Sequence, residues 1–189
     1  MSFYTKLVSN EWLTPPPRSP ALHLFFTLIA CDSSVPAGAF CWEVLHRDPH
    51  LPAIHQASWW QWPPRVCTRF SMPAREALAC VRTSQDALPH MERPAIWLVD
   101  CLPVLQALAK GFSSKPILNA LTRCLRNIDG ILWIWVPTDL MPADVYSRKS
   151  GFSPMRVHPG SILSWPLRTF LSQQLQKTPQ RLEHSWVIK

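Results

Sequence analysis

The sequence predicts an α/β fold built on a five-stranded mixed sheet with helices packed against its faces. Three strand-length apolar segments follow one another early in the chain, with turn residues between them. Beyond them, segments with helical spacing alternate with two short and strongly apolar strands. The order β-β-β-α-β-α-α-β-α is typical of a mixed sheet that helices cover.

The three leading strands are separated by turn and loop chemistry. LHLFFTLIAC (22–31) has the length of a strand, and SSVPAG (33–38) supplies a turn after it. AFCWEVL (39–45) alternates well enough to form a hairpin with the first strand. A loop rich in proline and histidine follows at 46–56, and SWWQW (58–62) is predicted as the third strand, stopped by the prolines after it.

Prolines at their favoured early helical positions mark where the helices begin. Apolar residues recur with helical spacing in PAREALACVRTSQDAL, PVLQALAKGF and ILNALTRCLRNI, while AIWLV and GILWIWV are continuous apolar runs typical of buried strands. The sequence therefore predicts helices over 73–88, 103–112, 117–128 and 141–149, and strands over 95–99 and 130–136.

Composition divides the chain into three parts. Residues 1–21 end in TPPPRSP and are expected to form an arm or linker, which would also suit a junction cut from a longer polyprotein. Residues 22–150 form the predicted domain. Residues 151–189 are rich in Ser, Pro and Arg and are expected to be a C-terminal extension with one short helix within 163–176.

Charge favours a polyanionic partner. The 189 residues include 19 Lys and Arg against 12 Asp and Glu, a net charge of +7, which suits nucleic acid. The longest apolar run is too short to span a membrane. The first residues lack the apolar region of a signal peptide, so we expect an intracellular protein, cytoplasmic or nuclear, with a mitochondrial address left open.

Cysteines and histidines show no metal-ligand spacing. The chain has no CxxC pair and no HxxxH pair, which argues against a zinc site. We expect buried free thiols at the six cysteines, which are Cys31, Cys41, Cys67, Cys80, Cys101 and Cys124.

Four acids fall at the ends of predicted elements. Asp32 and Asp100 follow apolar strands, Glu76 lies in the first turn of the helix at 73–88, and Asp144 enters the last helix. Each has a local explanation, as a turn residue or as an acid at the start of a helix. The predicted strand order, however, would bring all four together.

In this order of acids, Asp, Glu, Asp, Asp, the chain resembles ribonuclease H over about residues 22–150. ACDSSVPAGAFCWEV is similar to that family's first strand, turn and second strand, MPAREALACV to its glutamate-bearing helix, and WLVDCLPVLQAL to its fourth strand and the helix after it. WVPTDLMPADVYSRK resembles the VP…NPADxLSR ending of ribonuclease H domains in retrotransposon reverse transcriptases.

The resemblance implies the ribonuclease H-like five-stranded mixed sheet, with strands 1 to 3 antiparallel and strands 4 and 5 parallel to strand 1. It implies that Asp32, Glu76, Asp100 and Asp144 hold two Mg²⁺ or Mn²⁺ ions, with no small-molecule cofactor, and cut the RNA strand of RNA/DNA hybrids. Crowded carboxylates repel one another, and divalent cations relieve that repulsion.

Contacts to the nucleic acid are expected outside the acids, at Ser33, Ser34, Cys101, Gln106, Lys110, Lys115, Arg123 and Arg148. Cys101 departs from the family, which usually has Ser or Asn there, and it is a poorer partner for a ribose hydroxyl. The loop VPTDLMP lacks the histidine that often assists product release, and its Asp139 is expected to be a solvated loop acid.

The ten tryptophans have two interpretations. They could stack on bases or sugars, but packing between sheet and helices is favoured for residues such as Trp60 and Trp133. Trp165 and Trp186 could instead anchor a partner.

Two functions agree with the sequence. The first is a retroelement-type ribonuclease H, for which an upstream reverse transcriptase domain is the expected partner. The second is a catalytically weak or inactive ribonuclease H-like domain that binds nucleic acid or serves as a structural subunit of a larger ribonucleoprotein. A transposase or integrase is disfavoured, because those enzymes use a late glutamate where this chain has Asp144.

Overall fold

The computed structural model describes residues 26–45, 52–91, 93–182 and 184–188. The expected arm at 1–21, the start of the predicted first strand and residues 46–51 of the loop predicted at 46–56 lie outside the described residues.

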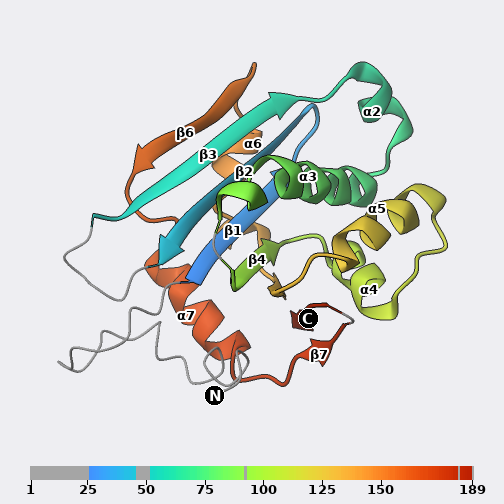
Figure 1. Ribbon diagram of the computed structural model, residues 1–189. Helices are drawn as coiled ribbons and strands as arrows, with labels where there is room; N and C mark the ends of the chain where they lie inside the picture. Colours follow the sequence, from blue (N-terminus) through green and yellow to red (C-terminus); the bar gives the residue numbers. More distant parts are fainter. Residues whose placement is uncertain (1–25, 46–51, 92, 183, 189) are drawn as a thin grey trace.

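An eight-stranded mixed sheet runs through the molecule in the order β6-β3-β2-β1-β4-β5-β8-β7 (Figure 1). Its central strands, in the order 3-2-1-4-5, are the five that the sequence predicts. β1, β2 and β3 are antiparallel, and β4 and β5 run parallel to β1. These directions confirm the predicted fold class. The five strands are β1 (Phe26–Ser33), β2 (Ala37–Leu45), β3 (Ile54–Gln61), β4 (Ala95–Val99) and β5 (Ile131–Trp135).

Two strand boundaries differ from the prediction. β1 continues to Ser33, so Asp32 lies inside the strand, paired with Ala39, and not after it. β3 begins at Ile54, four residues before the predicted start at 58 and inside the predicted loop. The polar residues at the start of β3 are in strand conformation because β3 pairs on both sides, with β2 and with β6 (Ser153–Pro159). Pairing between segments far apart in the chain leaves no mark on the local pattern.

Helices cover both faces of the sheet. α3 (Met72–Asp86), α4 (Leu102–Lys110) and α5 (Pro116–Arg126) pack on one face with the core that contains Ile29 and Trp97. The short α6 (Asp144–Ser147) and α7 (Trp165–Gln174) pack on the other face. The structure adds α2 (Pro64–Arg69) and the 3-10 turns η1 (Leu88–His90) and η2 (Thr138–Leu140), which the sequence did not predict.

Residues 151–189, which composition sets apart as an extension, contribute to both edges of the same sheet. β6 pairs with β3, β8 (Trp186–Ile188) lies parallel to β5, and β7 (Gln180–Arg181) pairs with β8. The predicted helix within 163–176 is present as α7, which buries Leu167 and Leu171.

Most of the tryptophans within the described residues fill the interior, as the favoured interpretation predicts. The rings of Trp97 and Trp133 are fully buried and stack with centroids 4.7 Å apart. Trp60 and Trp62 are buried over β2, where a Cβ added to Gly38 would lie 2.6 Å from Cζ2 of Trp62, so only glycine fits. Trp165 differs, since 78% of its surface is exposed.

All six cysteines are free, and Cys31, Cys41 and Cys80 are buried as expected. Cys124 was expected to be buried but lies exposed on α5, because the helix turns that position away from the sheet. Within the described ranges, no helix combines the length and the apolar character needed to cross a bilayer.

Candidate active site

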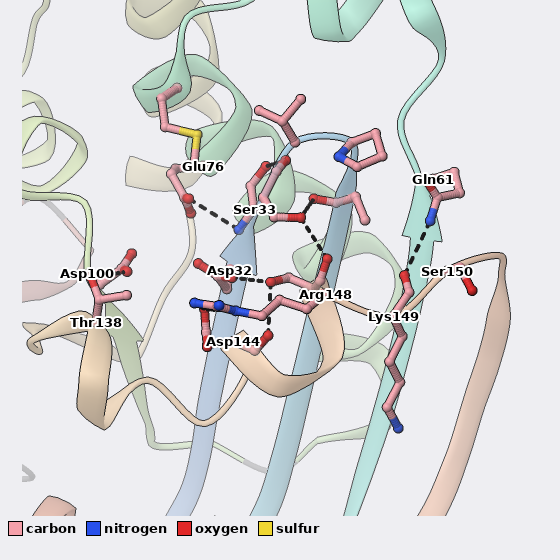
Figure 2. Close-up of a pocket in the computed structure, with 16 residues that line it drawn as sticks. Asp32, Ser33, Gln61, Glu76, Asp100, Thr138, Asp144, Arg148, Lys149 and Ser150 are labelled. Atoms are coloured by element: carbon pink, nitrogen blue, oxygen red, sulfur yellow. Dashed lines mark hydrogen bonds and ion pairs between the residues drawn. The ribbon is translucent and has the colours of Figure 1, made fainter.

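The four acids of the predicted site line one cavity of about 590 Å³ (Figure 2). β1 and β4 are adjacent and parallel, so their C-terminal ends lie side by side, which brings Asp32 and Asp100 together. Glu76 reaches them from the first turns of α3, and Asp144 begins α6 after β5 and η2. Four elements far apart in the sequence therefore present carboxylates to one space.

Three of the acids form a compact cluster. Asp32, Glu76 and Asp100 each offer a carboxylate oxygen, and these oxygens all lie within 4.8 Å of one another. Asp144 borders the same cavity but stands outside this set.

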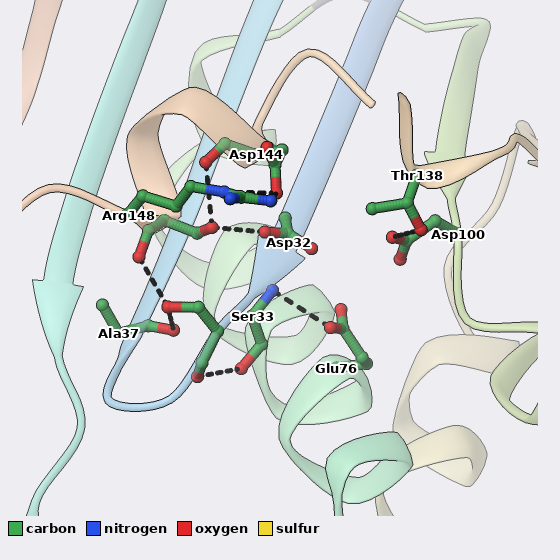
Figure 3. Close-up of polar contacts among 10 residues, drawn as sticks. Asp32, Ser33, Ala37, Glu76, Asp100, Thr138, Asp144 and Arg148 are labelled. Atoms are coloured by element: carbon green, nitrogen blue, oxygen red, sulfur yellow. Dashed lines mark hydrogen bonds and ion pairs between the residues drawn. The ribbon is translucent and has the colours of Figure 1, made fainter. Parts of the chain in front are cut away.

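Each clustered carboxylate accepts a hydrogen bond from the protein (Figure 3). The Ser147 hydroxyl donates to Oδ2 of Asp32. The backbone N–H of Ser33 donates to Oε1 of Glu76 over 3.1 Å, and the Thr138 hydroxyl donates to Oδ2 of Asp100 over 2.9 Å. These bonds orient the acids and leave other carboxylate oxygens directed into the cavity.

Sequence reasoning missed the two hydroxyls, Thr138 and Ser147. Ser147 is the serine of ADVYSR, three residues after Asp144, so its place in the motif was the signal that could have found it. Thr138 gave no such signal, because it meets Asp100 only through η2.

Burial and mutual repulsion make the site costly to ionise. The pKa of Asp32 is raised to about 6, first by burial and then by the charges of Asp100 and Asp144, although the Ser147 hydrogen bond lowers it. Burial, with Asp32 and Asp100, raises the pKa of Glu76 well above its ordinary value. Burial and the charge of Asp144 also raise the pKa of Asp100, against the Thr138 hydrogen bond. A bound cation would reverse all three effects.

The residues present fit a hard divalent cation. Oε2 of Glu76 is buried and has no hydrogen-bond partner among the described residues, so a buried acceptor is left unsatisfied at the site. Carboxylate oxygens are the ligands that Mg²⁺ and Mn²⁺ prefer. Asp32, Glu76 and Asp100 are the residues that would hold such an ion, and Asp144 is the one available to a second.

The predicted nucleic-acid contacts divide into groups. Ser33, Ser34 and Arg148 line the same cavity as the acids, together with Gln61 and Lys149, which sequence reasoning missed.

Gln106, Lys110 and Lys115 line a second cavity of about 260 Å³, where the loop between α4 and α5 meets the start of α3. Cys101 is the residue preceding α4, half-buried beside Asp100. Arg123 lies on the exposed face of α5 and lines neither cavity.

Comparison with known proteins gives little. No family model matches the chain, and no curated protein matches it significantly. Among solved structures, the crystal structure of LC9-RNase H1, described as a type 1 RNase H with the type 2 active-site motif, aligns at 14% identity with a TM-score of 0.46. The alignment covers 87% of this chain and 90% of that chain. A likeness this distant says nothing about the chain's own activity.

Proposed function

We propose that the chain is a metal-dependent endonuclease that hydrolyses the RNA strand of RNA/DNA hybrids, a ribonuclease H of the retroelement type. The observation that carries this proposal is the convergence of Asp32, Glu76, Asp100 and Asp144 on one cavity, in the order that the resemblance to ribonuclease H implies.

The cofactor proposed is Mg²⁺ or Mn²⁺, two ions. When bound, such ions supply a water activated for attack and stabilise the charge on the leaving oxygen of a phosphodiester. The chain's own part is to hold its carboxylates in place: Ser147 orients Asp32, the Ser33 backbone orients Glu76, and Thr138 orients Asp100. Asp32 clusters with Asp100 and lines the same cavity as Asp144, so it would be the acid available to both ions.

The substrate class rests on charge and on the position of the second cavity. Met72 lines the acidic cavity and Pro73, the next residue, lines the second, so the two cavities adjoin at the start of α3. Lys110 and Lys115 at the second cavity could contact phosphates of a duplex whose scissile bond lies at the acids. The net charge of +7 supports the same partner.

The retroelement type is supported by the ADVYSR segment. Ser147 donates a hydrogen bond to Asp32, and Arg148 pairs with Asp144. The serine and the arginine that resemble the retrotransposon ending therefore both contact acids of the cavity. A reverse transcriptase domain in the same polyprotein, or a larger ribonucleoprotein, is the protein partner that this type suggests.

One observation favours the second function, a weak or inactive domain that serves as a subunit of a ribonucleoprotein. Burial raises the pKa of the Cys101 thiol to about 12, with Glu76 and Asp100 contributing, so the thiol stays neutral. A neutral thiol is a weak hydrogen-bond donor where the family usually has Ser or Asn beside the third acid. Hybrid binding without turnover would follow from such a site.

The test is cleavage of a hybrid whose RNA strand is end-labelled, in Mg²⁺ or Mn²⁺. We expect the wild type to cut the RNA strand and Asp100→Asn to lose about 10²- to 10³-fold in rate, since metal stabilisation of the transition state is worth several kcal/mol. Asp139→Asn is the matched control, because Asp139 is exposed in η2 and lines no part of the cavity.

Equal cutting by the wild type and Asp100→Asn would refute the nuclease assignment. Hybrid binding with no cutting by the wild type would support the subunit function instead.

A further inference from the structure

Arg148 is the cation nearest to the fourth acid of the site. Its Nε and Nη2 donate to Oδ1 of Asp144 over 3.0 and 2.8 Å (Figure 3). The pKa of Arg148 is raised by these hydrogen bonds, by the charge of Asp144 and, more weakly, by the charge of Asp32. The guanidinium therefore neutralises part of the charge that the carboxylates place in the cavity.

The ion pair between Arg148 and Asp144 can break at little cost. Asp144 begins α6 and Arg148 follows its last residue, so the two are one helical turn apart. The Arg148 side chain is 69% exposed, against 25% for that of Asp144. A pair of this spacing whose arginine is so exposed contributes little to stability, so the arginine can leave without disturbing the fold.

Both donors of Arg148 fall on the same oxygen of Asp144, the acid that lies outside the compact cluster. Oδ1 of Asp144 already accepts two charge-assisted hydrogen bonds, while Oε2 of Glu76 accepts none. A metal ion that used Asp144 would have to compete with Arg148 for the carboxylate. No such competitor pairs with Asp32, Glu76 or Asp100 in the described part of the chain.

We propose that Arg148 is an exchangeable counter-ion, which holds Asp144 in the substrate-free site and moves to a substrate phosphate when Asp144 takes a metal ion. A guanidinium binds phosphate and carboxylate with the same planar donors, so the exchange preserves its hydrogen bonds. The inference rests on the proposed nuclease function. Its consequence is that the ion held through Asp144 binds weakly until nucleic acid arrives.

The experiment measures Mn²⁺ binding to the protein without nucleic acid, by electron paramagnetic resonance of the free ion. Asp144→Asn identifies the binding phase that depends on Asp144. We expect Arg148→Gln to tighten that phase about 2- to 5-fold, the range that opening a surface ion pair gives, and to tighten the other phase less, because Arg148 acts on Asp32 only through its charge. Arg82→Gln is the control, because Arg82 forms an exposed pair of the same spacing with Asp86, 3.3 Å apart on α3.

Cleavage kinetics supply the second readout. At saturating metal, Arg148→Gln should raise the KM for the hybrid several-fold with little change in kcat, and Arg148→Lys should restore part of that loss because it keeps the charge. An Asp144-dependent phase that is unchanged or weaker in Arg148→Gln would overturn this inference alone. A wild type that binds no Mn²⁺ in any phase would overturn it together with the proposed function.

Discussion

Replacing Asp32 by asparagine should stabilise the metal-free protein. Asp32 is 5% exposed, and its pKa is raised from 3.8 to about 6, chiefly by burial. A difference of about two units corresponds to about 3 kcal/mol of unfavourable free energy in the folded state once the carboxyl is ionised. Asparagine keeps an oxygen for the Ser147 hydroxyl, and burying its amide offsets about 1 kcal/mol, which leaves a gain of about 2 kcal/mol.

The pH dependence has a definite sign. Because the folded-state pKa is the higher one, the folded protein holds its proton between pH 4 and pH 6 while the unfolded chain releases it. Wild-type stability therefore falls as pH rises through this window, and the full cost is present above it. The advantage of Asp32→Asn should be about 2 kcal/mol at pH 7.5, and below pH 4 it should give way to the cost of about 1 kcal/mol for the buried amide.

Urea unfolding in EDTA at pH 7.5 and at pH 3.5 measures both values. The gain at pH 7.5 corresponds to a rise in Tm of about 4–8 °C for a domain of this size. Asp139→Asn removes an exposed acid and should change stability by less than about 0.5 kcal/mol. An Asp32→Asn protein that is less stable than the wild type at pH 7.5, or equally favoured at both pH values, would refute the electrostatic reasoning.

Three further outcomes follow from the site and from the packing of the sheet. Ser147→Ala removes a hydrogen bond that lowers the pKa of Asp32, so the acid limb of the pH–rate profile should move to higher pH; an unmoved limb would contradict the bond's role. Adding Mg²⁺ at pH 7.5 should raise the Tm of the wild type, and EDTA should reverse it, whereas Asp32→Asn should respond far less; equal responses would place the ion elsewhere. Gly38→Ala should lower the free energy of unfolding by about 1–3 kcal/mol in denaturant titrations, because its Cβ would meet the Trp62 ring at 2.6 Å; a neutral result would mean that the ring moves freely.

The central fold could be predicted from sequence because its strands are short, buried and continuously apolar. The strand predicted at 95–99 has the bounds of β4, and α5 begins at Pro116, one residue before the helix predicted at 117–128. The edge strands could not be predicted, because β6 contains prolines and exposed polar residues and becomes a strand only by pairing with β3.

The same distinction holds at the site. Asp32 lies in the last two residues of β1, Asp100 follows β4 and Asp144 begins α6, and the topology brings these positions together, so their meeting was predictable from strand order. Their hydrogen-bond donors depend on how η2 and α6 settle against the sheet, which local sequence does not encode. Surface residues such as Arg123 were predicted as nucleic-acid contacts from their charge alone. Charge does not determine which face of a helix a residue occupies.

The central claim is that folding gathers these carboxylates into a binding site for divalent metal, and anomalous diffraction from crystals soaked in Mn²⁺ tests it most directly. The expected result is anomalous density inside the cavity, with Mn²⁺ at about 2.0–2.3 Å from oxygens of Asp32, Glu76 and Asp100. Crystals that bind Mn²⁺ only at other surfaces, or that leave the cavity empty at millimolar Mn²⁺, would contradict the account.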